Sequence, residues 1–106
     1  MITLEEFKKL ELKVAKIIEA EDHPNAQKLY VLTIDLGEKT KQIVAGIKSS
    51  YRSEDLVGKQ IVVVDNLEPA MLRGVESQGM LLAASDDVGM SIVTLDKERK
   101  LGSVVK

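Results

Sequence analysis

Hydrophobic and polar positions alternate in short stretches along most of the chain. Leu10, Leu12 and Val14 alternate with charged neighbours, and the alternation changes phase at Ile17-Ile18. A period of two is typical of a strand with one buried face, and a change of phase inside it indicates a β-bulge or a sharp coil. Residues 12–21 are therefore predicted to form a long strand that bends around a barrel.

The same pattern predicts several further strands and two short helices. The predicted strands cover residues 29–36, 42–47, 61–65, 79–84 and 91–95. Gly37-Glu38-Lys39 predicts a hairpin turn between the first two of these. Thr3 and Glu6 form a capping-box motif that predicts a helix over residues 4–10, and residues 53–56 predict one capped helical turn.

Five or more short strands with scattered glycines favour an all-β fold. The pattern fits a small closed five-stranded barrel with a short N-terminal helix, and the OB-fold is the best-known binding protein of this kind. The chain has 106 residues and no linker or repeat, so residues 1–106 are predicted to form one domain. The apolar runs are too short to span a membrane, and no signal peptide is recognised, so we expect a cytoplasmic protein.

The composition excludes most catalytic and metal chemistry. The chain has no cysteine and one histidine, which removes disulfides, thiolate zinc sites and most histidine-based sites. His23 precedes Pro24 and is predicted to be an extended turn residue. Ser77 lacks the glycine two positions earlier that a nucleophile elbow requires. We therefore expect no enzymatic activity, no metal site and no cofactor.

Charge changes the picture of possible partners. The formal net charge is −2, so a chain of this kind can bind a polyanion only if its cations gather on one face. Most lysines, together with Arg52 and Arg73, lie in the first three quarters of the sequence. The last quarter contains the acidic residues Asp86, Asp87 and Asp96. This asymmetry suggests a basic face, although charged runs are often only solvated surface.

The most informative segment lies between the predicted strands at 61–65 and 79–84. It reads as an irregular turn that carries Asn66, Arg73 and Ser77 and leads to Met80. Binding residues concentrate on loops held by rigid strands, so these four residues are candidates for function. The alternative is a surface connection with a single arginine.

Four motifs in order give the chain a resemblance to a known family. They are HPNAQKL at residues 23–29, TKQIVAGI at residues 40–47, NLEPA at residues 66–70 and RGVESQGM at residues 73–80. Together they resemble the tRNA-binding domain family, which includes the C-terminal domain of methionyl-tRNA synthetase, free tRNA-binding proteins and a secretion-related chaperone branch. The resemblance runs from about Phe7 to the end of the chain. It implies an OB-fold barrel with a C-terminal extension over about residues 85–106.

The resemblance also implies a tRNA site. Its candidate residues are Lys28, Lys41, Asn66, Arg73, Ser77 and Met80. Lys41 stands where many relatives have arginine, and Met80 can equally be a core strand residue. Only three aromatic residues are present, so stacking of bases on aromatic rings is a poor fit, and the expected recognition is of RNA shape and phosphates.

The chain ends are apolar, and relatives of this family are often dimers through terminal extensions. We therefore expect a homodimer, with an interface drawn from Leu4, Phe7, Ile92, Val93, Leu95, Leu101, Val104 and Val105. Packing of the ends within one chain is the alternative.

The predicted function is a non-catalytic tRNA-binding module, either the beta subunit or the C-terminal domain of methionyl-tRNA synthetase, which helps the catalytic subunit hold tRNA. A homodimeric, secretion-related chaperone that binds peptides is the alternative.

Overall fold

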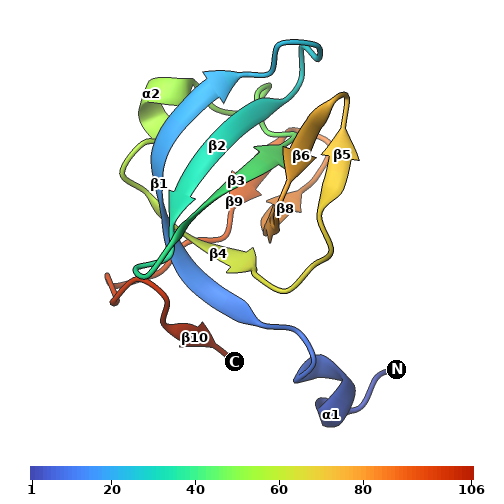
Figure 1. Cartoon of the computed structure of the whole chain (residues 1–106), viewed down its shortest axis with the longest axis vertical. Helices are drawn as coiled ribbons and strands as arrows, with labels where there is room; N and C mark the ends of the chain where they lie inside the picture. The colour runs from blue at the N-terminus through green and yellow to red at the C-terminus, as the bar shows by residue number, and fades with distance from the viewer.

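Five antiparallel strands wrap into a nearly closed barrel in the computed structural model, which describes all 106 residues (Figure 1). The strand order is β3-β2-β1-β4-β7. Their bounds are β1 Leu12–Asp22, β2 Tyr30–Asp35, β3 Thr40–Ala45, β4 Gln60–Val64 and β7 Met80–Leu81. The predicted all-β barrel is confirmed.

The remaining helices and strands are shorter and are not part of the five-stranded barrel path. They are α1 Leu4–Phe7, α2 Ser53–Leu56, the hairpin of β5 Ala70–Leu72 and β6 Val75–Ser77, the pair β8 Ala83–Ser85 and β9 Met90–Ile92, and β10 Val104–Val105. β10 pairs with the beginning of β1, so the C-terminal end of the chain returns to the N-terminal end. Neither helix is long or apolar enough to cross a membrane.

β1 is the strand that bends. Its first half pairs with β4 through Leu12–Lys16, and its second half pairs with β2 through Lys16–Asp22. The register between β1 and β2 shifts between Ile17 and Glu19, which is where the alternation of the sequence changes phase. The predicted bulge is confirmed, and it lets one strand turn the corner between the two halves of the barrel.

Hydrogen bonds of Ser77 and Gln78 bridge the seam between β3 and β7. Gln78 donates its backbone N–H to Gln42 O at 2.8 Å and accepts from Gln42 N–H through Oε1 at 2.9 Å. The hydroxyl of Ser77 accepts from Val44 N–H at 2.9 Å. Ser77 and Gln78 therefore supply bonds that a longer β7 would otherwise make.

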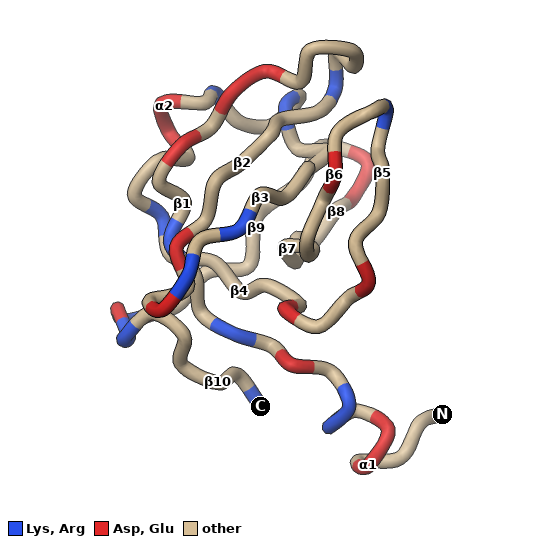
Figure 2. Tube along the Cα trace, in the orientation of Figure 1, with Lys and Arg blue, Asp and Glu red and all other residues tan.

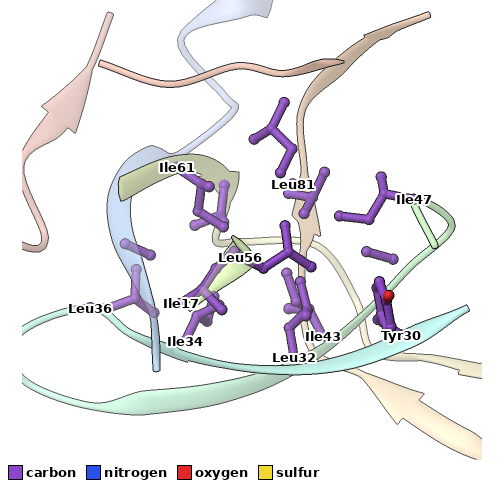
Figure 3. Packing of buried hydrophobic residues seen from close by; sticks show 14 residues of the cluster. Ile17, Tyr30, Leu32, Ile34, Leu36, Ile43, Ile47, Leu56, Ile61 and Leu81 are labelled. Carbon is purple, nitrogen blue, oxygen red and sulfur yellow. The ribbon is translucent and has the colours of Figure 1, made fainter. Parts of the chain in front are cut away.

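The core fills the interior of the barrel with branched aliphatic side chains (Figure 3). The cluster includes Leu32 and Ile34 of β2 and Ile43 of β3, and α2 contributes the fully buried Leu56. A second, smaller cluster of Leu12, Val62 and Val64 lies on the other side of β4. Since Ile61 and Val63 face the barrel interior, β4 is buried on both of its faces.

Several predicted boundaries were wrong. The first helix ends at Phe7 with Lys8 as its C-cap, although its capping box of Thr3 and Glu6 is confirmed. Arg52, and not Ser53, is the N-cap of α2, and no side chain caps it. The strand predicted at 79–84 is divided into β7 and β8, and the one predicted at 91–95 stops at Ile92.

Candidate nucleic-acid interface

The segment predicted to be an irregular turn contains the β5–β6 hairpin. Leu72 pairs with Val75, which leaves Arg73 and Gly74 as a two-residue turn with φ of 54° and 89°. Two successive positive φ values are the pattern of a type I′ hairpin turn. Arg73 is the only residue other than glycine with positive φ, which costs about 1 kcal/mol for an ordinary side chain. The turn lifts the arginine to the tip of the hairpin.

The loop between β1 and β2 holds this tip in place. The His23 side chain is buried, and its Nε2 donates to Leu72 O at 2.9 Å while its Nδ1 accepts from Asn25 N–H at 2.9 Å. Both bonds can form only in the neutral tautomer that carries its proton on Nε2. Asn25 Nδ2 donates to Arg73 O at 3.2 Å, and Arg73 Nη2 donates to Asn25 O at 3.3 Å. Two loops distant in sequence are therefore clasped together (Figure 1).

Two cations on these clasped loops are available to an incoming anion. Arg73 and Lys28 are both exposed, and neither forms an ion pair with an acidic side chain. Met71, on the same hairpin, is also exposed. The surface thus combines unpaired positive charge with an apolar contact, and its backbone is fixed before any ligand arrives.

Lys41 occupies a different environment, because it neutralises a buried carboxylate. The Asp65 side chain is 6% exposed, with Lys41 Nζ 2.7 Å from Oδ1 and the Nζ atoms of Lys13 and Lys39 3.3 and 3.4 Å from Oδ2. Burial alone would raise the pKa of Asp65, but hydrogen bonds from Lys41 and Lys13 and the charges of Lys41 and Lys39 outweigh it. The pKa of Asp65 therefore lies below its ordinary value.

Two further predicted residues use their polar groups inside the chain. Asn66 donates to Lys9 O at 2.7 Å and accepts from Glu11 N–H at 2.9 Å, which ties the N-terminal segment to the end of β4. Ser77 is buried, and its hydroxyl donates to Gly79 O at 2.9 Å while it accepts from Val44 N–H. Both residues shape the loop that carries Arg73.

Met80 is not a core residue. Its side chain is 48% exposed and lines an apolar cleft of about 310 Å³ between the end of β3 and the β7–β8 segment. Val44, Gly46 and Leu82 contribute to the walls of this cleft. The structure also brings no three His, Asp or Glu residues together in a way that could hold a metal ion.

The predicted site residues thus fall into two groups. Lys28, Arg73 and Met80 are exposed, whereas Lys41, Asn66 and Ser77 have partners within the chain. Sequence reasoning missed His23 and Asn25 as residues that build the surface. The only available signal was their position in the HPNAQKL motif, because their partners lie 48 and 49 residues away.

Comparison with known proteins gives a consistent result. The family model described as "Putative tRNA binding domain" matches residues 12–104. The chain is 52% identical over 105 residues to "Methionine--tRNA ligase" of Thermococcus kodakarensis and 50% identical over 106 residues to that of Methanocaldococcus jannaschii. These matches cover 99% of this chain, but only 14% and 16% of the two relatives.

Solved structures of similar size share the whole fold. A methionyl-tRNA synthetase-related protein from Pyrococcus horikoshii is 34% identical with a TM-score of 0.93, over 100% of this chain and 98% of that one. The chaperone CsaA from Bacillus anthracis is 30% identical with a TM-score of 0.91, over 100% and 99%.

Proposed function

Because this chain belongs to the tRNA-binding domain family, we propose that it binds tRNA through the surface formed by the β1–β2 loop and the β5–β6 hairpin. The observation that carries the proposal is the clasp of His23, Asn25 and Arg73, which holds an arginine at the tip of a hairpin next to a loop that carries an exposed lysine. Arginine and lysine are the residues that contact phosphates in protein–RNA complexes.

The six predicted residues have different parts in this proposal. Arg73 and Lys28 contact phosphate or ribose, and Met80 gives an apolar contact at the neighbouring cleft. Ser77 and Asn66 keep the loop in position through their internal hydrogen bonds. Lys41 lies opposite Ile34 near the end of β2, where it neutralises Asp65, so it is not part of the Arg73 surface.

Recognition on this surface is by shape. The exposed groups of the clasped loops can bond phosphates and riboses, which every tRNA presents, and the chain has few aromatic rings on which bases could stack. We therefore expect several unrelated tRNAs to bind with similar, modest affinity.

The chain spans about one seventh of the length of the synthetases that it matches. In the proposed setting it is a cytoplasmic tRNA-binding module that works as a subunit or C-terminal domain beside a methionyl-tRNA synthetase catalytic unit. A weak general binder raises the effective concentration of tRNA near the catalytic unit without adding any chemistry of its own.

A homodimer is the second part of this proposal. α1 has a single turn, contains no buried residue and exposes 66% of Leu4, whereas a helix of one turn is not stable alone in water. Phe7, Leu95 and Val105 pack against the small buried cluster on the outer side of β4 and are themselves only partly buried, and Val104 is exposed. A second copy would cover these groups, with Val93 and Leu101 at the margin.

Ile92 is not part of the proposed interface, although it was among the residues predicted for it. Its side chain is buried among the core residues of its own chain, so it is not available to a second copy. The pairing of β8 with β9 carries Ile92 into the interior.

A peptide-binding chaperone is the second candidate function, and one observation favours it. The apolar cleft beside Met80 could take an apolar side chain, and the CsaA structure has the same fold. A filter-binding titration with unfractionated tRNA, run against a fluorescence titration with unfolded peptides, tests both ideas. Saturable tRNA binding without peptide binding supports our proposal, and the reverse result would replace it with the chaperone.

A further inference from the structure

A cleft lined by lysines lies far from the β5–β6 hairpin that carries Arg73. It has a volume of about 650 Å³ and lies between the β2–β3 turn and residues 100–103. Lys13 of β1, Lys39 of the turn and Lys100 near the C-terminus line it. Three separate parts of the chain therefore bring ammonium groups to one hollow.

The walls of this cleft are held by close backbone packing. A Cβ atom at Gly37 would lie 2.9 Å from Leu101 O, and one at Gly102 would lie 2.6 Å from Leu36 O, so the two turns interlock. Gly102 N–H donates to Val14 O at 2.8 Å, and Val14 N–H donates to Ser103 O at 2.9 Å. The segment that carries Lys100 is therefore fixed against β1 and the β2–β3 turn.

Positive charge around the cleft exceeds what neutralising Asp65 requires. Lys13 and Lys39 share one carboxylate oxygen of Asp65, while Lys41 takes the other. Lys100 has no ion pair, and the only acidic residue that lines the cleft is the exposed Glu38. Figure 2 shows basic positions of β1, of the β2–β3 hairpin and of the C-terminal segment on this side of the barrel, with acidic positions between them.

This excess stands out against the rest of the molecule. The whole chain carries a formal charge of −2, yet four lysines gather here around three carboxylates: Asp65, Glu38 and Asp35, whose Oδ1 accepts from Gly37 N–H at 2.8 Å. The acidic last quarter of the sequence would have placed Lys100 among carboxylates, but the fold brings it beside Lys13 and Lys39. An anion with several oxygens, which can accept from more than one ammonium group, is the ligand that such a hollow fits.

We propose that this cleft binds a phosphate group, and that the tRNA backbone supplies it. The second clause rests on the proposed function. β2 has six residues, so at about 3.3 Å per residue its two ends lie roughly 20 Å apart. The tip of the β5–β6 hairpin lies beside the beginning of β2, whereas the β2–β3 turn, which lines the cleft, follows its end (Figure 1). A folded RNA spans both sites, whereas a small phosphate compound reaches only one.

The first test uses two variants of equal net charge. K39Q/K100Q removes two lysines of the cleft, and K97Q/K106Q removes two exposed lysines that form no ion pair and do not line it. We expect K39Q/K100Q to weaken tRNA binding about tenfold at low salt and to reduce the slope of log affinity against log salt by roughly 1. The control should change the affinity by less than about threefold, which is the effect of net charge alone.

The second test separates the cleft from its RNA. Inorganic pyrophosphate is titrated into the protein while the backbone amide signals of Gly37, Lys39 and Gly102 are followed by NMR. We expect saturable shifts in the wild-type protein and in K97Q/K106Q, and none in K39Q/K100Q. These shifts assign the cleft as an anion site even if the wild-type protein binds no tRNA, in which case only the proposed function fails.

Two results would overturn the proposal. If pyrophosphate shifts the three amides but K39Q/K100Q binds tRNA like the control, the phosphate does not come from RNA. If pyrophosphate causes no saturable shift and tRNA binding is unchanged, the cleft is not an anion site.

Discussion

The buried carboxylate of Asp65 allows a sharp test of the electrostatics described above. Asn in its place keeps the shape of the side chain but removes the charge that three lysines share. Hydrogen bonds to charged groups contribute about 1.5 to 3 kcal/mol each, but Lys39 is half-exposed and its pair contributes at most about 1 kcal/mol. The carboxylate also loses hydration when it is buried, which offsets part of the gain.

We therefore expect Asp65→Asn to lower the free energy of unfolding by about 2 kcal/mol at pH 7. The full penalty of breaking a buried pair, about 3 to 5 kcal/mol, does not apply because the lysines keep contact with water. Urea denaturation followed by circular dichroism measures the difference. Asp22→Asn is the control, because Asp22 is mostly exposed and pairs only with Lys48, so its loss should be below about 0.5 kcal/mol.

The pH dependence gives a second measure of the same effect. The pKa of Asp65 in the folded protein lies below its value in the unfolded chain, which is about 3.9. The stability from its ionised form is therefore complete above the unfolded pKa and is lost as the pH falls through the folded pKa. The difference between wild type and Asp65→Asn should stay constant from pH 7 to pH 5 and shrink below about pH 4. A difference below 0.5 kcal/mol, or one that does not change between pH 7 and pH 3, would refute this account.

Three further predictions concern the surface, the seam and the chain ends. Arg73→Ala should weaken tRNA binding about tenfold or more in a filter-binding assay, since a charge-assisted contact contributes roughly 1.5 to 3 kcal/mol, whereas Lys97→Ala should leave it nearly unchanged. Ser77→Ala should lower the free energy of unfolding in urea by about 1 to 3 kcal/mol, because Val44 N–H would lose its buried acceptor. Sedimentation equilibrium should give a mass near twice 11.7 kDa for the wild type and near 11.7 kDa for L4E/V104E.

Each of these expectations can fail on its own. Equal losses for Arg73→Ala and Lys97→Ala would mean that the tRNA surface lies elsewhere. If Ser77→Ala unfolds like the wild type, its hydroxyl does not hold the seam between β3 and β7. A wild-type mass near 11.7 kDa at micromolar concentration would exclude the homodimer.

The features that the sequence predicted correctly depend on neighbouring residues. Residues close together in the sequence predict three features that the structure has. They are the bulge at Ile17, the Gly37-Glu38-Lys39 turn and the capping box of Thr3 with Glu6. The β5–β6 hairpin was missed because Arg-Gly is not one of the pairs, such as Asn-Gly, that mark a type I′ turn.

The remaining features depend on distant partners, which a pattern of residues cannot pair. The buried role of His23 depends on Leu72 O, and the environment of Lys41 depends on Asp65. Arg73 was predicted from its place on a loop between two strands and from the resemblance to a family, whereas its φ and its clasp with Asn25 come only from the fold. The same reason explains Lys100, whose neighbours in space come from the other end of the chain.

The clasp between His23, Asn25 and the hairpin tip has a consequence for the kinetics of binding. Two loops that would each lose conformational freedom on meeting an RNA are already ordered by the folding of the protein. Encounters then need no slow rearrangement of these loops before Arg73 and Lys28 meet the RNA. Variants that loosen the clasp while keeping Arg73 should therefore associate more slowly as well as dissociate faster.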